Sequence, residues 1–329
     1  MYKTKSLSGL PMGSAEPLII SLQHFCIHDG PGIRSLVFFK GCPLRCIWCQ
    51  NVESWKPEAQ IAFKAHLCIN CGRCVERCPE NALPSVGKRN AELCRYCFTC
   101  TDSCPSGAMT RFGISLTVED IMEKLRPEFS LFRTSGGGVT FTGGEPTLYP
   151  DFAGKLSQAL RAEGIDIALE TCGFFNLEKL RPLLRELQLV LFDIKVFDEA
   201  QHERLCGQKN TEIKKNLKSL VAAWNRKEGP MIWPRLPLIP GMTDDHENIK
   251  NWAGILRELG IPFLTIVPYH PMGANKRRWL GLPAIPELHV PTDEEIKKIE
   301  KLFSDEGIKI YKPGEEDLHG YSDPSFSVS

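Results

Sequence analysis

The pattern of apolar and polar positions predicts a repeated alternation of strands and helices over most of the chain. Short apolar runs predict strands at 33–39, 139–142, 166–170, 189–194, 231–239, 263–267 and 308–311. Stretches with helical spacing of apolar residues follow at 117–126, 152–161, 177–187, 210–224, 245–259 and 292–303. Such an alternation is typical of a parallel sheet covered by helices, so the predicted fold class is α/β.

Local signals refine these elements. Thr117 and Asn176 directly precede two predicted helices and are expected to be their N-caps. Pro234 and Pro237 weaken the middle of the strand predicted at 231–239. Glycine and polar residues recur where the strands end, which is where parallel barrels hold their active sites. About six strand–helix units are visible, too few for a complete eight-unit barrel.

The composition changes between residues 59 and 112, where cysteine, proline and glycine dominate and no long stretch with helical spacing of apolar residues appears. This stretch is interpreted as an inserted small domain. The predicted organisation is therefore a first part of the main domain at 1–58, the insert at 59–112 and the remainder of the main domain at 113–329.

Composition narrows the class of protein. The 329 residues are 42% apolar and carry 40 basic and 40 acidic side chains, so no net charge favours nucleic acid or an anionic membrane. The first residues lack the apolar run of a signal peptide, and no stretch of about 18 apolar residues is present. The expected location is the cytoplasm. Most of the fourteen cysteines lie in three groups, which favours iron–sulfur or metal ligation over disulfides.

The first group consists of Cys42, Cys46 and Cys49, directly after a predicted strand. Three thiolates at this spacing can bind three corners of a [4Fe–4S] cubane and leave one iron open to a small molecule. The alternative is a structural zinc loop with a distant fourth ligand. It is disfavoured because structural zinc sites usually combine two Cys-x2-Cys steps.

The second and third groups each have the full Cys-x2-Cys-x2-Cys-x3-Cys-Pro run of bacterial ferredoxins, in which the fourth cysteine ligates the other cluster. The predicted ligand sets are Cys68, Cys71, Cys74 and Cys104 for one [4Fe–4S] cluster and Cys94, Cys97, Cys100 and Cys78 for the other. Gly72 allows a tight turn between ligands. Two zinc knuckles would not need the terminal Cys-Pro.

With these motifs the sequence resembles the radical S-adenosylmethionine (SAM) activating enzymes of glycyl radical enzymes, whose pyruvate formate-lyase member lacks the ferredoxin insert. The resemblance rests on the segments 29–34, 41–51, 135–140, 143–146, 170–173, 193–195 and 268–270. It implies a partial (β/α)6 radical SAM barrel with an inserted ferredoxin-like domain that holds two [4Fe–4S] clusters. The cofactors would be three [4Fe–4S] clusters and SAM.

The resemblance also assigns site residues. Cys42, Cys46, Cys49 and Lys195 would be catalytic. SAM would contact Trp48, Cys49, Gln50, Gly143, Gly144, Glu145, Asp193, Ile194, Lys195 and His270. The glycines are expected where backbone approaches the ligand closely. A monovalent cation would bind at Glu170, Thr171 and Asp193. The target peptide would contact Asp29, Gly30, Arg34 and Arg235. Gln50 and Glu170 depart from the histidine and aspartate of the pyruvate formate-lyase activase.

The implied function is reductive cleavage of SAM to a 5′-deoxyadenosyl radical, which takes a hydrogen atom from a glycine of a partner enzyme. The expected partners are a glycyl radical enzyme and flavodoxin or ferredoxin as electron donor, with a monomeric chain. One alternative is a radical SAM enzyme that acts directly on a small molecule or peptide. Another is a pure electron carrier, which leaves the three-cysteine loop unexplained.

Several residues outside these motifs have simpler interpretations. Cys26, Cys172 and Cys206 are expected to be small buried residues rather than ligands. Arg235 has a second interpretation as an ion-pairing residue at a strand end.

Overall fold

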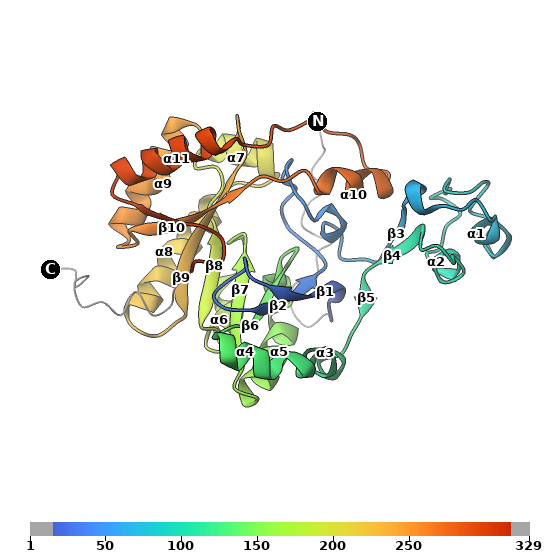
Figure 1. Ribbon diagram of the computed structural model, residues 1–329, viewed down its shortest axis with the longest axis horizontal. Coiled ribbons are helices and arrows are strands. Elements are labelled where there is room, and N and C mark those ends of the chain that lie inside the picture. The colour runs from blue at the N-terminus through green and yellow to red at the C-terminus, as the bar shows by residue number, and fades with distance from the viewer. Residues whose placement is uncertain (1–15, 317–329) are drawn as a thin grey trace.

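The computed structural model describes residues 16–316, and the main body of this part is a nine-stranded sheet (Figure 1). The strand order is β11-β10-β9-β8-β7-β6-β2-β1-β5. The bounds are β1 Leu18–Cys26, β2 Arg34–Phe39, β5 Ile114–Ser115, β6 Gly138–Gly143, β7 Asp166–Thr171, β8 Leu189–Asp193, β9 Met231–Leu238, β10 Phe263–Pro268 and β11 Lys309–Tyr311. From β2 to β11 neighbouring strands are parallel, whereas β1 and β5 pair antiparallel at one edge.

Helices connect the parallel strands, so the predicted strand–helix alternation is confirmed. Their bounds are α3 Val118–Leu125, α4 Phe129–Ser135, α5 Pro150–Ala162, α6 Leu177–Leu184, α7 Glu199–Cys206, α8 Thr211–Asn225, α9 His246–Glu258, α10 Gly273–Trp279 and α11 Asp293–Asp305. Short 3₁₀ turns are η2 Val52–Ser54, η3 Ala65–Leu67, η4 Arg126–Glu128 and η5 Pro146–Leu148. The sequence did not predict β1, α4, α7 or α10. None of the described helices is long and apolar enough to span a membrane.

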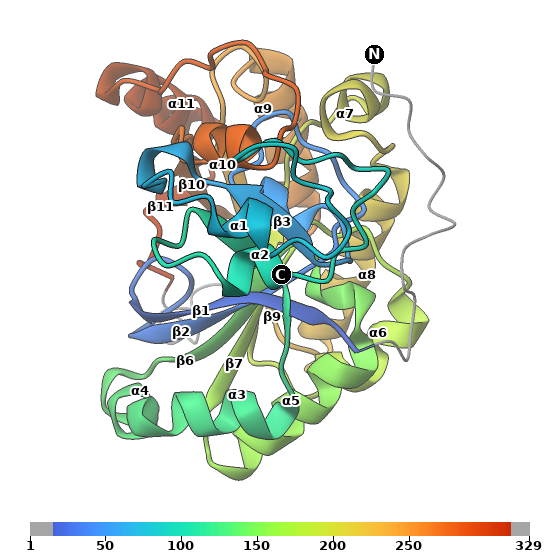
Figure 2. The same cartoon turned by 90° about the vertical axis from the view of Figure 1, so that its right-hand side faces the viewer.

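The main hydrophobic core lies between the sheet and its helices. Helix α5 packs on β7, α8 on β9 and α11 on β11. Figure 2 shows α3, α4, α5 and α6 on one flank of the sheet, with α9 and α11 at the opposite end. Apolar side chains such as Phe141, Leu169 and Leu256 are fully buried there. This packing fixes the positions of the strand ends, where the loops that carry the candidate site residues begin.

The predicted helix caps are confirmed. The Thr117 hydroxyl accepts a hydrogen bond from the backbone N–H of Asp120, and the Asp120 carboxylate accepts one from the backbone N–H of Thr117. The Asn176 side chain accepts from the backbone N–H of Lys179. Each cap satisfies N–H groups that have no partner within the helix.

Strand β9 forms in spite of its two prolines. Pro234 lies opposite Phe192 of β8, and Pro237 opposite Val267 of β10. A proline removes one ladder donor, but the strand remains paired on both sides because Arg235 still accepts from the backbone N–H that follows β8. The prolines therefore lower the number of ladder bonds without breaking the strand.

The cysteine-rich stretch builds a small sheet of its own and projects from the main body (Figure 1). Strands β3 Gln60–Phe63 and β4 Met109–Phe112 pair antiparallel and join the stretch to the main body. Two single-turn helices, α1 Arg73–Glu76 and α2 Thr99–Asp102, lie beyond them. Ile61, Leu83 and Met109 form a separate core together with cysteine side chains. The boundaries of the insert at residues 59 and 112 stay a prediction. The first predicted segment begins, and the last one ends, in residues 1–15 and 317–329, which lie outside the described residues.

Candidate active site

Cys42, Cys46 and Cys49 lie in the loop after β2, at the carboxyl end of the parallel strands. This stretch, residues 42–49, is called the cysteine loop below. Burial, together with the neighbouring thiols of Cys46 and Cys42, raises the pKa of Cys49 to about 12. Thiolates so close together repel one another, so their joint ionisation requires positive charge among them. The loop therefore fits a cationic iron–sulfur core better than three free thiols.

Helix α7 anchors the cysteine loop. The backbone N–H of Arg45 donates to the carbonyl of Cys206 at 2.7 Å, and that of Ile47 donates to the carbonyl of Leu205 at 3.0 Å. The last carbonyls of a helix have no partner within the helix, so the loop and the helix end satisfy one another. The end of α7 thus fixes the path of the loop.

Two further cysteines lie beside this loop. Cys172, just after β7, and Cys206, at the end of α7, belong to the same small apolar cluster as Cys46, and Cys42 packs against that cluster. Both residues are buried, with 7% and 0% of their surface exposed, as expected for small apolar residues. Their position beside the candidate ligands was not predicted, because neither belongs to a Cys-x-x-Cys step.

Gly143 and Gly144 are required by backbone packing. A Cβ on Gly143, whose φ is +106°, would lie 2.6 Å from the backbone nitrogen of Phe39. A Cβ on Gly144 would lie 2.1 Å from the carbonyl oxygen of Gly41. We expected the close approach to be to a ligand; in the structure it is to the end of β2, and it sets the position of the cysteine loop against β6.

Glu145 connects the ends of β6 and β7. Its Oε1 accepts from the Thr147 and Thr171 hydroxyls at 2.8 Å each, and its Oε2 accepts from the backbone N–H of Cys172 at 2.8 Å. Burial raises the pKa of this carboxyl, although these hydrogen bonds oppose the rise. Glu145 therefore holds two strand ends together next to the cysteine loop.

Lys195 is a buried cation beside the candidate cluster ligands. Its Nζ lies 2.6 Å from the Asp193 carboxylate. Burial lowers the pKa of Lys195, but Asp193 and the thiols of Cys46 and Cys172 raise it above its usual value. The ammonium group is therefore positively charged at the site. Ile194 is fully buried in the core, so its backbone is the part that faces the strand end.

The remaining predicted SAM contacts surround the same strand ends. Trp48 is buried and packs in a small apolar cluster with Tyr269, the residue after β10. Gln50 is half-buried, and His270 is exposed. The structure thus brings Trp48 close to the end of β10, while the His270 side chain contacts solvent.

Asp29, Glu170 and Arg235 form a charged cluster from distant parts of the chain. An Arg235 Nη lies 3.3 Å from Glu170 and 3.7 Å from Asp29, and its other Nη donates to the His28 carbonyl at 3.1 Å. Arg235 is only 3% exposed. Burial raises the pKa of Glu170 to about 7; Asp193 and Asp29 add to the rise, and Arg235 opposes it. This carboxyl therefore titrates near neutral pH.

The predicted cation site is not assembled by its side chains. Thr171 gives its hydroxyl hydrogen to Glu145, because neighbouring residues of a strand face opposite sides and Glu170 points the other way. Asp193 pairs with Lys195. Among residues 16–316, no group of three or more His, Cys, Asp or Glu side chains that could hold a metal ion is found. The cation site stays a prediction.

The Arg34 side chain, which was predicted to contact a target peptide, lies inside the protein. Its guanidinium is buried and donates to the Thr140 hydroxyl at 2.7 Å and to the Val139 carbonyl at 3.1 Å. Its side chain also packs against Gly30, where a Cβ would lie 3.1 Å from the Arg34 chain. Arg34 therefore stabilises the start of β2 against β6, and a peptide contact would require these bonds to break.

Helix α10 packs directly on the segment that carries the cysteine loop. A Cβ on Gly273 would lie 2.4 Å from the Cys49 carbonyl oxygen, so the first turn of α10 touches the loop backbone. Lys276 donates to the Asn51 side chain at 2.9 Å and pairs with the Glu53 carboxylate. Helix α10 therefore covers the end of the loop.

The other end of α10 contacts the cysteine-rich stretch. The Trp279 ring stacks on His66, with centroids 5.8 Å apart, and Lys64 lies 5.3 Å from its centre. His66 lies two residues before Cys68. One short helix therefore links the cysteine loop to the beginning of the first ferredoxin run.

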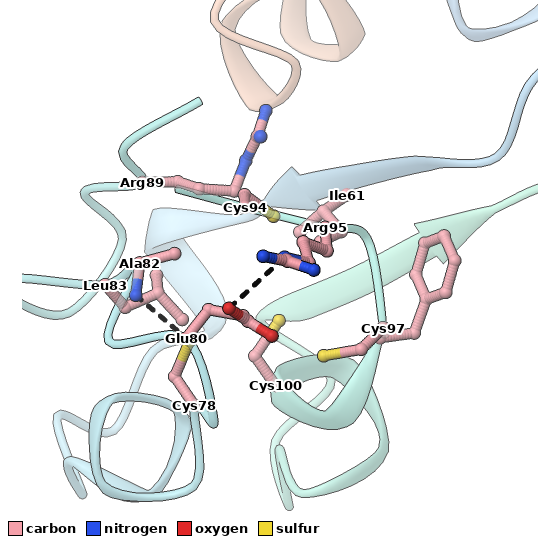
Figure 3. Close-up of a pocket in the computed structure, with 11 residues that line it drawn as sticks. Ile61, Cys78, Glu80, Ala82, Leu83, Arg89, Cys94, Arg95, Cys97 and Cys100 are labelled. Atoms are coloured by element: carbon pink, nitrogen blue, oxygen red, sulfur yellow. Dashed lines mark hydrogen bonds and ion pairs between the residues drawn. The ribbon is translucent and has the colours of Figure 1, made fainter. Parts of the chain in front are cut away.

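The eight ferredoxin-type cysteines line two pockets. One is lined by Cys78, Cys94, Cys97 and Cys100 (Figure 3). The other is lined by Cys68, Cys71, Cys74 and Cys104. The fourth cysteine of each run thus joins the first three of the other run, as the ferredoxin pattern requires.

The two runs also share backbone conformation. Asn70 and Tyr96 both have positive φ, as do Gly72 and Phe98 two residues further on. Glycine adopts this conformation freely, whereas a phenylalanine does so only when the surrounding structure enforces it. The matching turns therefore reflect a common requirement of the two pockets and not the presence of glycine.

Backbone N–H groups point at cysteine sulfurs in both pockets. The N–H of Ala82 donates to Cys78 at 3.2 Å, and that of Met109 donates to Cys104 at 3.3 Å. Such bonds stabilise thiolates and tune the clusters that thiolates hold. Both pockets therefore offer four thiols and at least one backbone N–H group that bonds to sulfur.

Because His202 of α7 is buried, we expect the protein to lose stability in acid. Burial lowers its pKa to about 4, although the Gln208 carbonyl, 2.6 Å from Nδ1, opposes this. Between the usual pKa of about 6.5 and pH 4 the unfolded chain binds the proton better, so stability falls as pH falls, by up to about 3 kcal/mol. Urea unfolding between pH 7 and pH 5 measures this, and His202→Asn is expected to flatten the dependence. An equally steep dependence in that variant would contradict the assignment.

Comparison with known proteins identifies the class. The radical SAM superfamily model matches residues 87–253, about half of the chain, and a 4Fe-4S binding domain matches residues 62–83. The (2S)-3-sulfopropanediol dehydratase activating enzyme of Klebsiella oxytoca is 40% identical over 81% of this chain and 86% of its own length. The trans-4-hydroxy-L-proline dehydratase activating enzyme of Clostridioides difficile is 38% identical over 87% of this chain and 96% of its own length.

Among solved structures, a domain of a pyruvate-formate lyase-activating enzyme from Bacteroides vulgatus matches 54% of this chain and 99% of that chain. The identity is 29% and the TM-score is 0.44. The curated relatives carry the assignment: the chain belongs to the activating enzymes of glycyl radical enzymes within the radical SAM superfamily.

Proposed function

We propose that this enzyme binds SAM at a [4Fe–4S] cluster held by Cys42, Cys46 and Cys49 and activates one partner enzyme by forming a radical on a backbone glycine. Cys42, Cys46 and Cys49 would hold the cluster, which, once reduced by an external one-electron donor, would supply the electron that splits the S–C5′ bond of SAM into methionine and a 5′-deoxyadenosyl radical. That radical takes one hydrogen atom from the glycine Cα and leaves as 5′-deoxyadenosine. The single observation that carries the proposal is the three-cysteine loop at the end of β2 in a chain whose relatives are activating enzymes.

The residues around the loop fit SAM. The positively charged Lys195 is suited to the methionine carboxylate, and Asp193 beside it to the ribose hydroxyls. The buried Glu145 is an acceptor for the methionine ammonium group. Trp48 provides an aromatic surface for the adenine. Together these groups orient the sulfonium and exclude water from the radical.

We propose that the partner's glycine loop enters at the charged cluster of Asp29, Glu170 and Arg235. The end of β1 and the loop that carries Asp29 also expose two large apolar side chains, Phe25 at 65% and Ile27 at 55%. Exposed apolar residues next to polar groups are typical of a surface that binds another protein. The partner is a glycyl radical enzyme, which these side chains would contact.

The cysteine-rich stretch is proposed to hold two further [4Fe–4S] clusters that carry electrons from flavodoxin or ferredoxin. All four cysteines are present at each pocket, so neither cluster has an open iron for substrate. All fourteen cysteines are free, which fits the reducing cytoplasm, where the enzyme would act as a monomer. The partial (β/α)6 barrel would be the six parallel strands from β2 to β10.

The crossed ligand sets make a specific prediction. The double variant C68A/C104A removes two ligands of one cluster, so we expect about eight iron atoms per chain in place of about twelve, with the other auxiliary cluster unchanged. The matched variant C68A/C78A removes one ligand from each cluster, so both should be perturbed. Iron analysis and electron paramagnetic resonance of the reduced proteins measure this. Ligation within each run would give the opposite pattern.

The function is tested with anaerobically reconstituted enzyme, SAM and a strong reductant. We expect 5′-deoxyadenosine, and with a cognate glycyl radical enzyme an organic radical signal by electron paramagnetic resonance. A shift of hyperfine splitting on deuteration of the target glycine identifies the site. Absence of SAM cleavage would refute the proposal. Cleavage that requires a small molecule or peptide, and gives no protein radical, would favour the alternative of a directly acting radical SAM enzyme.

A further inference from the structure

The two pockets of the cysteine-rich stretch are built on one repeated plan. The first pocket is that of Cys68, Cys71, Cys74 and Cys104, and the second pocket is that of Cys78, Cys94, Cys97 and Cys100. A shift of 26 positions relates the four cysteines of one pocket to those of the other. The same shift relates Leu83, which lines the second pocket, to Met109, which lines the first. Differences between equivalent positions therefore show how two copies of one unit have diverged.

Three equivalent positions differ in charge. The second pocket is lined by Glu80, Arg89 and Arg95, where the first pocket has Ser106, Phe63 and Ile69. The lining of the second pocket thus carries one net positive charge. Apart from its thiols, the described residues that line the first pocket are uncharged.

Two of the three charges compensate one another. The Nε of Arg95 lies 3.4 Å from a carboxylate oxygen of Glu80, and Figure 3 shows this ion pair beside the cysteine side chains. The Arg95 side chain is 79% exposed, so water and salt screen its charge. The pair therefore adds little net field at the second pocket.

Arg89 carries the remaining charge. The residue is half-buried, and its Nη1 is buried without a hydrogen-bond partner among the described residues. Its guanidinium lies 4.9 Å from the centre of the Tyr96 ring, which belongs to the loop between Cys94 and Cys97. A charge surrounded by protein acts more strongly on its neighbours than one surrounded by water. Arg89 consequently gives the second pocket a positive bias.

Hydrogen bonds to sulfur do not separate the two pockets. A backbone N–H donates to one ligand sulfur in each. A hydroxyl also lies near a sulfur in each, since Ser106 is 3.7 Å from Cys104 and Thr99 donates to Cys97 at 3.4 Å. Charge is therefore the feature in which the two linings differ most.

We propose that the charged lining gives the cluster of the second pocket the higher reduction potential of the two auxiliary clusters, with Arg89 as the main determinant. Net charge and solvent exposure are general determinants of iron–sulfur potentials. Reduction makes a cluster more negative, so a positive charge at the second pocket stabilises its reduced form. The first electron taken up by the cysteine-rich stretch therefore rests at the second pocket, and the first pocket holds the stronger reductant. This inference rests on the proposed function, which places one [4Fe–4S] cluster in each pocket.

An anaerobic potentiometric titration of the full reconstituted chain tests this order. Electron paramagnetic resonance follows the reduction, and the SAM cluster is recognised by the change of its signal on SAM addition. At the midpoint of the upper auxiliary transition, we expect the reduced-to-oxidised ratio of the other auxiliary cluster to be about tenfold lower, which corresponds to a separation of about 59 mV for one electron. Arg89→Met keeps the apolar stem and should lower the upper midpoint until the two transitions overlap. Arg89→Lys keeps the charge and should keep them apart.

Further variants change the charge in the opposite direction or at a control position. Glu80→Gln removes the partner of Arg95 and should raise the upper midpoint. Ile69→Arg places a cation at the equivalent position of the first pocket, where the native residue is 65% exposed, and should raise only the lower midpoint. Lys88→Met removes an exposed charge next to Arg89 that lines neither pocket, and should leave both midpoints unchanged.

The outcomes distinguish this inference from the proposed function. Auxiliary clusters that titrate together in the parent, or an R89M protein with full iron content and the parent midpoints, overturn the inference and leave the proposed function intact. A shift in K88M as large as that in R89M overturns it as well, because overall charge would then be the cause. About four iron atoms per chain in the parent would mean that both auxiliary clusters are absent, and their proposed role would fail with this inference while SAM cleavage persists. If R89M takes up less iron, an upward shift in E80Q supports the inference and any other result overturns it.

Discussion

Replacement of Cys49 by alanine is expected to abolish SAM cleavage and to lower the iron content from about twelve to about eight atoms per chain. Cys49 is one of three thiols in the loop after β2. With only two thiolates left, a second iron of the cubane has no protein ligand, so the SAM cluster should be lost as a whole. The two pockets of the cysteine-rich stretch have their own four ligands and should keep their clusters. Iron analysis and chromatography of 5′-deoxyadenosine measure both effects.

Cysteine substitutions elsewhere are the controls. Cys26 at the end of β1 lies outside all three groups, so Cys26→Ala should keep about twelve iron atoms and full cleavage. Cys172→Ala and Cys206→Ala are stricter controls, because these residues pack in the same apolar cluster as Cys42 and Cys46. We expect both to retain the cluster. A C206A protein with about eight iron atoms would instead make Cys206 a ligand and remove the open iron from the proposed mechanism.

Replacement of Arg235 by methionine is expected to destabilise the fold strongly and to prevent radical transfer to the partner. The change leaves the carboxylates of Glu170 and Asp29 without their cation. Removing one partner of a buried ion pair typically costs about 3–5 kcal/mol. At pH 8 Glu170 is ionised in the parent protein and depends on Arg235, so the loss should be larger, although removal of Arg235 also raises the pKa of this carboxyl. At pH 6 it carries a proton, because its pKa is about 7, so the loss should be smaller.

Urea unfolding of the reconstituted protein at both pH values measures this effect. Arg226→Met removes an exposed pair with Glu228 and should cost no more than about 0.5 kcal/mol. The double variant E170Q/R235M removes both partners and should recover part of the loss. SAM cleavage without partner should persist in R235M while the glycyl radical yield falls. Equal losses at pH 6 and pH 8 would be evidence against the role of Glu170.

Much of the fold could be predicted because it depends on local patterns. The β7 run at Asp166–Thr171 and the cap at Asn176 are set by residues a few positions apart. The crossed arrangement around the ferredoxin-type pockets was also accessible, since the Cys-Pro ending fixes which cysteine leaves its own run. Strand β1 was missed because it owes its place to pairing with β2 rather than to a pattern of its own.

The parts of the site that the sequence did not reveal depend on long-range packing. Arg34 was expected at a peptide surface, but its burial depends on Thr140, more than one hundred positions away. Trp55 contacts Arg277 of α10, more than two hundred positions further along the chain. Gly143 was expected to face a ligand, yet its neighbour is the backbone of Phe39. In each case the residue type indicated that the position matters, but the sequence did not show which residue it contacts.

The dependence of the cysteine loop on α7 and α10 has a consequence for the order of biosynthesis. The loop at residues 42–49 leaves the ribosome early, but its anchors end at Cys206 and Trp279. At about 5–20 residues per second, roughly ten seconds or more separate the two events. The cysteine-rich stretch, by contrast, contains all eight of its thiols between Cys68 and Cys104. All eight of these thiols are therefore made early in translation, whereas the cysteine loop gains its contacts with α7 and α10 only after residue 279 has been made.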